Sequence, residues 1–296
     1  VCHLCLNGFK QTLDRAGIFF DSWDWESIFT WNGDVSRSIE MLKRTPYVFM
    51  KGGVLEFDGN RVAQDLNLKG ILGFRDEYEI PSLTLARADG TTLYTTRDIA
   101  YSIWKLKRSD RVINVVGMEQ KLAQLQLKLA LCALGYMDEV NRLKHFSYNL
   151  VSVPGHRISS RRGRYITFDE VLDDAVQRAY EEVSKRSPNI PEEEKRKISE
   201  LVGIGAVKFA LVETDPSKPV VFTWDRVIDF ERNSAPYIQY SHARSCSILR
   251  KMPDTSMAEA DFSLLKEPIE QEIILTVARF PEVFIDSADN LRPNAI

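Results

Sequence analysis

The spacing of apolar residues predicts helices and a hairpin in the first sixty positions. Phe9, Leu13 and Ala16 recur at helical spacing, and Gly17 follows where a C-terminal cap belongs, so we expect a short amphipathic helix over residues 8–17. Apolar residues at 35, 39 and 42 indicate a second helix. The next segment, 47–57, is typical of a β-hairpin whose strands meet at a pair of glycines.

A strand-loop-helix unit follows. Regularly spaced isoleucines and a leucine predict a helix that begins near Thr95 or Thr96, either of which could cap it. The apolar run 112–116 is typical of a strand buried on both faces, and the spacing over 122–133 predicts the helix after it. Residues 145–151 alternate like a last strand. This order of elements predicts an α/β domain.

The remainder of the chain is expected to be nearly all helix. Prolines interrupt the pattern between 188 and 191, and the acids that follow suit a helix N-terminus because they lie at the positive end of the dipole. The expected helices are 168–183, one with its N-terminal turn at 191–194 and its apolar positions over 198–212, one capped by Asn233 or Ser234, and 263–280.

Composition excludes several classes of protein. Of the 296 residues, 44% are hydrophobic and 27% charged, the balance of a soluble chain with a real core. The net charge of -3 argues against indiscriminate coating of nucleic acid, but cations cluster at 105–111, 156–164 and 244–251, so nucleic acid would meet local patches. No apolar run approaches the roughly 20 residues of a membrane helix, and no signal peptide is visible. We therefore expect a cytoplasmic protein with no membrane partner.

The cysteines give little support for a metal site. Cys2 and Cys5 form one C-x-x-C, but no second C-x-x-C or His-x-His pair lies at zinc-ligand spacing. We expect no tightly bound metal.

The segment 153–164 combines cations, hydroxyls and glycines between the two halves of the chain. Its four arginines within eight residues cannot all find carboxylate partners locally, and Gly155 and Gly163 let the backbone fold tightly and approach a ligand. A polyphosphate would satisfy these cations, so a phosphate-handling loop is one interpretation. A solvated basic surface loop is the other.

Carboxylates accompany aromatic rings in two places. Residues 18–27 mix aromatic side chains with three acids, among them Glu26, which suggests a cationic ligand, internal pairs, or a surface acid that caps the next segment. Tyr94 and Asp98 are four residues apart and can share one face of a helix, although Asp98 could also be a helix-dipole partner. Gln120 follows the 112–116 strand at its carboxyl end, where ligands bind in open α/β sheets.

A third pattern lies on the helix after Ser234. Tyr237, Tyr240 and Arg244 fall on one stripe, where two phenols and a guanidinium could stack nucleobases and pair a phosphate. Core packing is the commoner use of tyrosines on such a stripe.

These segments resemble, in order, motifs of arginyl-tRNA synthetases. Residues 157–163 are similar to that family's variant of the KMSKS loop, M-S-T-R-K-G, with Ile158 for Met, Ser160 for Thr and Arg162 for Lys. The other matches are G-F-x-x-T-L and F-D-x-W-x-x-E-S within 8–27, D-G-x-x-x-Y-x-x-x-D-I-A-Y at 89–101, V-x-x-x-x-Q ending at Gln120, and Y-x-Q-Y-x-x-A-R at 237–244. The resemblance covers most of the chain, although Ala123 stands where many relatives have histidine.

The resemblance implies a fold and an activity. Residues 1–167 would be the second half of a Rossmann-type class I catalytic domain, and 168–296 the first part of an α-helical anticodon-binding domain. The implied enzyme is an arginine-tRNA ligase of protein synthesis, which uses ATP with Mg²⁺ to form arginyl-adenylate and transfers arginyl to tRNA(Arg). No H-I-G-H motif is present, so we expect 1–296 alone to be inactive. Another class I synthetase, such as cysteinyl, and a non-catalytic tRNA-binding relative are the alternatives.

The resemblance also implies roles for individual residues. Carboxylates would hold the planar guanidinium of L-arginine, and the basic loop would neutralise charge on the leaving pyrophosphate. The implied arginine-binding residues are Glu26, Tyr94, Asp98 and Gln120, and the implied catalytic residues are Ser159, Ser160, Arg161 and Arg162. The implied ATP contacts are Gly155, His156, Arg157, Ile158 and Gly163, and the implied tRNA contacts are Tyr237, Gln239, Tyr240 and Arg244.

Overall fold

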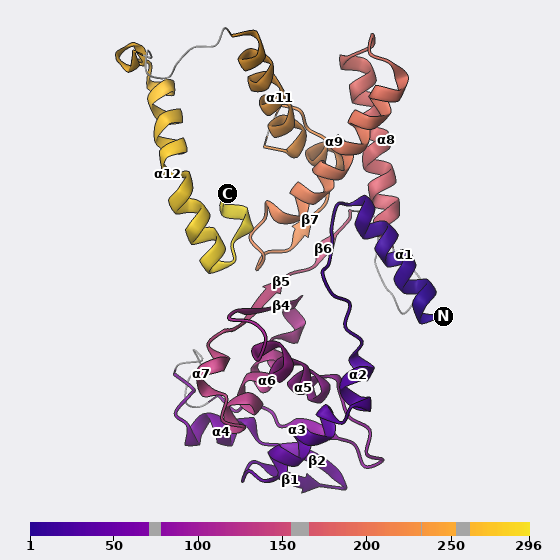
Figure 1. The fold of residues 1–296 in the computed structure, drawn as a ribbon, viewed down its shortest axis with the longest axis vertical. Coiled ribbons are helices and arrows are strands. Elements are labelled where there is room, and N and C mark those ends of the chain that lie inside the picture. Colours follow the sequence, from indigo (N-terminus) through magenta and orange to yellow (C-terminus); the bar gives the residue numbers. More distant parts are fainter. Residues whose placement is uncertain (71–77, 155–165, 232, 253–260) are drawn as a thin grey trace. The chain divides into compact units, whose positions relative to one another are not determined.

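The chain divides into two units. The structure is a computed structural model and describes residues 1–70, 78–154, 166–231, 233–252 and 261–296. One unit is Phe20–Tyr148, and the other combines Val1–Phe19 with Asn149–Ile296 (Figure 1).

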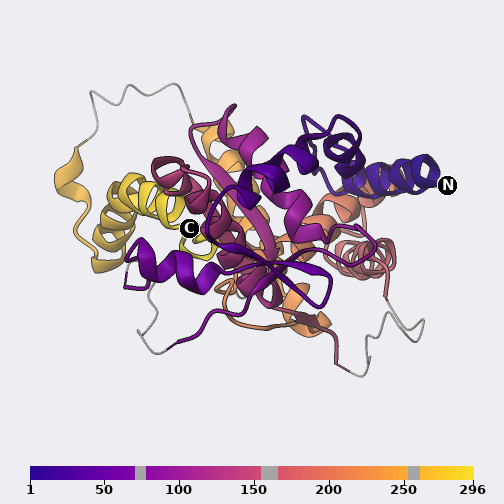
Figure 2. The same cartoon turned by 90° about the horizontal axis from the view of Figure 1, so that it is seen from below.

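A three-stranded antiparallel sheet lies at one edge of the Phe20–Tyr148 unit. β1 (Val48–Lys51) and β2 (Val54–Phe57) form the expected hairpin, and β3 (Leu83–Ala86) pairs with β2. Gly52 and Gly53 between the first two strands have φ of 56° and 81°, values that favour glycine because a Cβ atom would be strained there. The hairpin, at the lower edge of this unit in Figure 1, lies in front in Figure 2.

The strand-helix-strand unit expected from the sequence is present. β4 (Val112–Gly117) and β5 (Leu143–Tyr148) pair in parallel, so the last strand begins earlier than expected. The connection contains η1 (Met118–Gln120), α6 (Lys121–Ala133) and α7 (Met137–Val140). The expectation that β4 is buried on both faces is wrong, because Ile113 and Val115 are 40% and 61% exposed. The strand alternates instead, with Val112 and Asn114 buried.

Helices complete this unit around one core. They are α2 (Glu26–Trp31), α3 (Asp34–Lys43), α4 (Gly59–Asp65) and α5 (Tyr94–Leu106). Fully buried Phe57, Leu85, Ile99 and Leu129 belong to the core, which joins the antiparallel sheet to α5 and α6. This packing fixes the start of α5, where the candidate site lies.

The start of α5 differs from the sequence prediction. Leu93 is the N-cap residue and gives no side-chain cap, so the proposed capping by Thr95 or Thr96 is wrong. The Thr96 hydroxyl is buried and donates instead to the carbonyl of Leu85 on β3, over 2.9 Å. The Thr96 hydroxyl therefore holds the first turn against β3, and no side chain caps α5.

An antiparallel helix pair forms the centre of the other unit. α8 (Phe168–Arg186) begins with a capping box between Thr167 and Glu170, and α9 (Glu192–Val212) follows the expected proline break. Their axes approach closely at Gly203, where a Cβ atom would lie 2.7 Å from the backbone of Val176. Only glycine permits this approach without a shift of one helix.

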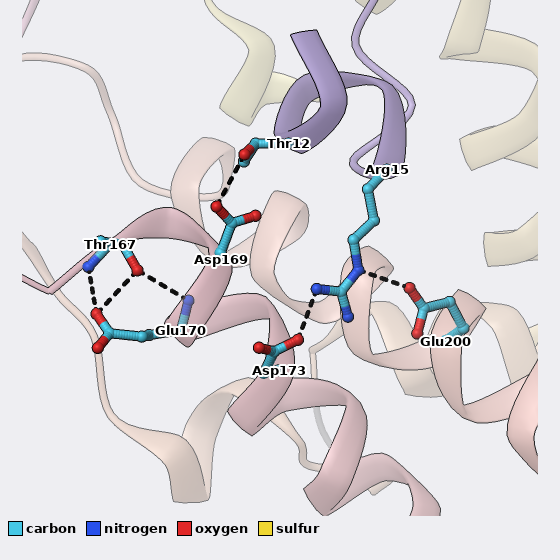
Figure 3. A network of polar contacts seen from close by, with 7 residues as sticks. All are labelled: Thr12, Arg15, Thr167, Asp169, Glu170, Asp173 and Glu200. Atoms are coloured by element: carbon cyan, nitrogen blue, oxygen red, sulfur yellow. Dashed lines mark hydrogen bonds and ion pairs between the residues drawn. The ribbon is translucent and has the colours of Figure 1, made fainter. Parts of the chain in front are cut away.

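The first helix of the chain packs on this pair. α1 (Cys2–Arg15) begins earlier than the expected residue 8 and ends at Ala16, which is buried in the α8–α9 core. Arg15 donates to Asp173 on α8 over 2.6 Å and to Glu200 on α9 over 2.8 Å, and Thr12 donates to Asp169 over 2.8 Å (Figure 3). Lys208 on α9 donates to the Ala16 carbonyl over 2.9 Å, so the C-terminal end of α1 has partners on both helices.

The remaining elements of this unit are mostly helical. β6 (Val151–Ser152) and β7 (Val220–Val221) form a short parallel pair. The others are α10 (Trp224–Val227), α11 (Ala235–Lys251), η4 (Phe262–Leu264), α12 (Pro268–Asn290) and η5 (Pro293–Ala295). Ser234 caps α11 and accepts from the Tyr237 amide, as expected. Across the described ranges, each helix is too short or too polar to cross a bilayer.

Candidate functional site

The first turn of α5 places two of the predicted residues at a cavity. Tyr94 is the first residue of the helix, and Asp98 lies one turn later on the same face. Gly90, with φ of 83°, turns the chain just before the helix, and Asp89 accepts from the Thr91 amide in that turn. The turn and the Thr96 bond to β3 together fix the direction in which α5 begins.

The cavity has a volume of about 260 Å³ and lies within the Phe20–Tyr148 unit. It combines three carboxylates, three aromatic rings and one guanidinium. Its lining residues are Asp24, Glu26, Phe29, Tyr94, Arg97, Asp98 and Tyr101, which come from the N-terminal side of α2, from α2 itself and from α5. Rings beside carboxylates suit an organic cation, because the rings contact its carbon stem and the carboxylates its charge.

Asp98 is the partly buried carboxylate of this cavity. Burial raises the pKa of Asp98 above its ordinary value, while the charge of Lys105 and a hydrogen bond from Gln124 act in the opposite direction. Glu26 adds a smaller effect that raises the pKa of Asp98 further. Lys105 and Gln124 compensate only in part for the burial of the Asp98 charge, so a cationic ligand would further stabilise the charged form.

Asp24 is a functional candidate that sequence reasoning missed. Its carboxylate accepts from the hydroxyl of Ser22 over 2.7 Å and from the hydroxyl of Tyr101 over 2.8 Å, and both bonds lower the pKa of Asp24. Burial and the bond to Asp24 raise the pKa of Tyr101 to about 12. The position of Asp24 two residues before Glu26 was visible in the sequence, but its partner Tyr101 is 77 residues away.

Glu26 lines the cavity but already has a cationic partner. The Arg97 Nε donates to Glu26 Oε1, and the Arg97 Nη1 donates to the Thr92 carbonyl over 2.7 Å. The Glu26 side chain is 60% exposed, compared with 28% for Arg97. The guanidinium of Arg97 is thus already paired with Glu26, the carboxylate that the resemblance assigned to the substrate guanidinium.

Gln120 is joined to the site through Tyr94. It is the last residue of η1, at the carboxyl end of β4, and its Oε1 accepts from the Tyr94 hydroxyl over 3.0 Å. All four predicted arginine-binding residues therefore lie in one region. Three line the cavity, and Gln120 contacts one of these three.

The predicted nucleic-acid residues lie on α11 in the other unit. Tyr237 and Tyr240 are 43% and 57% exposed, and Arg244 is also exposed. Their rings are therefore not packed in the core. Gln239 differs, because its Nε2 donates to the Leu201 carbonyl on α9 over 3.2 Å and its side chain meets Gly205. Tyr240 and Gln239 also line a groove of about 730 Å³ between α8, α9 and α11.

The predicted phosphate loop lies outside the described residues. This applies to the catalytic candidates Ser159, Ser160, Arg161 and Arg162, and to the ATP contacts Gly155, His156, Arg157, Ile158 and Gly163. Their roles stay predictions.

Cys2 and Cys5 are exposed and unoxidised at the start of α1. Within the part of the chain that the structure describes, no group of three or more histidine, cysteine or acidic side chains could hold a metal ion.

Comparisons with known proteins give the class of this fold and site. The family model "tRNA synthetases class I (R), catalytic domain" matches residues 42–224, more than half of the chain. A second model, "DALR anticodon binding domain", matches residues 238–296. The chain has the fold of a class I tRNA synthetase catalytic domain with a helical anticodon-binding domain. It belongs to the arginyl (R) family of class I tRNA synthetases.

Individual relatives agree with this assignment. The arginine-tRNA ligase of Ignicoccus hospitalis is 46% identical over 98% of this chain and 46% of its own length, and that of Aeropyrum pernix is 42% identical over 97% and 46%. The Thermus thermophilus arginyl-tRNA synthetase structure matches with a TM-score of 0.82 and 26% identity, over 97% of this chain and 51% of that one. The chain spans about half the length of the curated relatives it matches.

Proposed function

We propose that this chain is the arginine-recognising part of an arginine-tRNA ligase, which activates L-arginine with Mg-ATP and transfers it to tRNA(Arg). The observation that carries the proposal is the cavity at the start of α5, where Asp24, Glu26 and Asp98 gather beside aromatic rings. A cysteine side chain offers no positive charge to the partly buried carboxylate of Asp98, so the site does not suit a cysteinyl enzyme. The protein would work in the cytoplasm, where tRNA is charged for translation.

The proposed roles follow from the chemistry of each group. The carboxylate of Asp98 accepts hydrogen bonds from the substrate guanidinium, whose planar fork offers more donors in fixed directions than a lysine ammonium. Gln120, held by Tyr94 through its oxygen, orients the α-substituents of the amino acid with its amide N–H groups. The amino acid is thereby placed with its carboxylate directed toward the nucleotide.

The reaction has two steps. In the first, a carboxylate oxygen of arginine attacks the α-phosphorus of ATP, and the bond to pyrophosphate breaks. In the second, a hydroxyl of the terminal ribose of tRNA attacks the arginyl carbonyl, and AMP leaves with the bonding electron pair. Ser159, Ser160, Arg161 and Arg162 would stabilise the charge that develops on pyrophosphate, with Gly155, His156, Arg157, Ile158 and Gly163 as contacts to ATP.

The helical unit would bind tRNA through α11. Exposed Tyr237 and Tyr240 can stack on unpaired bases, and Arg244 can pair with a phosphate. Gln239, whose Nε2 donates to the Leu201 carbonyl, would support this surface by holding α11 on α9. The division into a catalytic part, 1–167, and an anticodon-binding part, 168–296, stays a prediction.

Calorimetric titration of chain 1–296 with amino acids tests the proposal. L-Arginine should bind more tightly than L-citrulline, which has the same shape without the charge, and Asp98→Asn should remove this preference. Equal affinity for both amino acids would contradict arginine recognition. Arginylation of tRNA by 1–296 is a separate question, because its detection would contradict only the expected inactivity of this chain.

A further inference from the structure

Two hydrogen bonds join α5 to the consecutive elements η1 and α6. The Tyr94 hydroxyl donates to Gln120 Oε1 over 3.0 Å. Four residues further along each segment, Gln124 Nε2 donates to Asp98 Oδ2 over 3.4 Å. Both pairs are 26 residues apart in the sequence. Because i and i+4 lie on the same helical face, α5 presents Tyr94 to the end of η1 and Asp98 to the first turn of α6. The second pair includes Asp98, the partly buried carboxylate of the cavity.

The contact at Asp98 continues into the interior. Asn114 on β4 donates from Nδ2 to Gln124 Oε1 over 2.8 Å, and Lys105 on α5 donates from Nζ to Asn114 Oδ1 over 2.7 Å. The chain of contacts therefore begins at an ammonium group and ends at a carboxylate. We call Lys105, Asn114 and Gln124 the relay.

The chemistry of the two ends fixes the direction of each amide. Lys105 can only donate, so Asn114 must present its oxygen to Lys105 and its nitrogen to Gln124. Gln124 must then accept through its oxygen, which leaves its nitrogen facing Asp98. Each amide has one orientation that avoids two donors or two acceptors in contact. The relay thus presents a donor, and never an acceptor, to the carboxylate of Asp98.

Core packing alone does not require these residues. Gln124 and Asn114 are only 7% and 8% exposed, and a buried amide that loses a partner costs free energy that an apolar side chain would avoid. Gln126, two residues along α6, is 6% exposed and shows the structural alternative, because it donates to the carbonyls of Pro81 and Ser82 and joins α6 to the chain before β3. Gln126 therefore serves as a control.

We propose that the relay orients the carboxylate of Asp98 and brings the positive charge of Lys105 close to it, so that Lys105, Asn114 and Gln124 are positioning residues for guanidinium recognition. The inference rests on the proposed function, because it concerns the same cavity. Asp98 remains the group that contacts the ligand. The relay acts through it.

Electrostatics at Asp98 support this role. Burial raises the pKa of Asp98, Lys105 and the Gln124 bond lower it, and Glu26 on α2 raises it. The ring centroid of Tyr101 lies 4.4 Å from Lys105 Nζ. Burial lowers the pKa of Lys105, and the charges of Asp98 and Asp24 oppose this effect without cancelling it. Without the relay, the effects of burial and Glu26 would be unopposed, and a larger share of Asp98 would be protonated at a given pH.

The test combines an NMR titration with ligand binding on chain 1–296. The carboxyl ¹³C resonance of Asp98, assigned with Asp98→Asn, reports its pKa without any ligand. Calorimetry gives the ratio of L-arginine to L-citrulline affinity. The variants are Gln124→Met and Lys105→Met, with Lys105→Arg as the charge-retaining variant and Gln126→Met as the matched control.

The relay predicts a joint change in both readouts. Gln124→Met and Lys105→Met should each raise the pKa of Asp98 and lower the arginine to citrulline ratio about tenfold, the size expected for a lost bond to a charged group. Lys105→Arg should recover most of the loss, and Gln126→Met should lower thermal stability without moving either readout. In the unaltered chain, the side-chain amide resonance of Gln124 should titrate with the midpoint of Asp98.

Two failures can be told apart. If the pKa of Asp98 stays within error in both methionine variants, or if the Gln124 amide does not follow Asp98 in the unaltered chain, the relay is refuted whatever the ligand does. If the unaltered chain binds arginine and citrulline equally while the pKa of Asp98 responds as expected, the relay stands and the arginine assignment of the cavity fails. The titration of the Gln124 side-chain amide in the unaltered chain keeps the test decisive even when a variant does not fold.

Discussion

The two predicted acidic partners of arginine should contribute unequally. The carboxylate of Asp98 is partly buried and faces the cavity, so Asp98→Asn removes a charge-assisted hydrogen bond worth about 1.5–3 kcal/mol, which is about 10- to 150-fold in arginine affinity. The Glu26 side chain is 60% exposed and already paired with Arg97. Exposed ion pairs are worth about 0–1 kcal/mol, so Glu26→Gln should weaken arginine binding about fivefold at most.

Calorimetry of L-arginine binding to the two variants measures this difference. Both substitutions remove one charge and keep the size of the side chain, so each is the control for the other. Thermal melting of both proteins checks that neither has lost the fold. If Glu26→Gln weakens binding as much as Asp98→Asn, Arg97 must leave Glu26 when arginine binds, and the reasoning from the observed pair is refuted.

Three further predictions concern the α8–α9 contact, the Tyr101–Asp24 bond and the exposed ring of Tyr240. Gly203→Ala should lower the free energy of unfolding by about 1–3 kcal/mol, because the new Cβ would lie 2.7 Å from the Val176 backbone; a gain in a urea titration, as helix propensity alone predicts, would contradict the close packing. Tyr101→Phe should lower the melting temperature at neutral pH. The pKa of Asp24 is lower in the folded chain than in the unfolded chain, so the stability that the Tyr101–Asp24 bond gives is present above the unfolded pKa and is lost as the pH falls through the folded pKa. The difference in melting temperature between the two proteins should therefore fade below pH 3.8. Tyr240→Ala should weaken tRNA binding in a filter assay by about 1–3 kcal/mol if its exposed ring stacks on a base, whereas unchanged binding would remove Tyr240 from the RNA surface.

Periodicity predicted the elements that depend on local spacing. The helix over 122–133 and the hairpin over 47–57 lie where apolar spacing and the glycine pair indicated, because these signals involve neighbours along the chain. The cap of α11 by Ser234 was predictable for the same reason. Errors arose where a distant segment competed for a side chain. Thr96 was expected to cap α5, but its hydroxyl bonds to Leu85 on the neighbouring strand.

The sequence predicted which residues belong to the site, but not which of them contact each other. Motif resemblance indicated Tyr94, Asp98 and Glu26, and all three line one cavity. The pairing of Glu26 with Arg97 depends on how α2 packs beside α5, which sequence spacing does not define. Asn114 lay within an apolar run that suggested an ordinary buried strand. Its role in the relay is visible only once Lys105 and Gln124 are seen on either side of it.

The docking of α1 on α8 and α9 has a consequence for the order of events during synthesis. The helical unit is discontinuous in sequence, and the partners of Arg15 lie 158 and 185 residues after it. At roughly 5–20 residues per second, Arg15 is synthesised roughly 10–40 s before Glu200. The intervening unit, Phe20–Tyr148, has a core of its own and can fold during that interval. Protection of the α1 amides from hydrogen exchange on stalled nascent chains should therefore appear only after α9 has emerged, well after α1 itself has been synthesised.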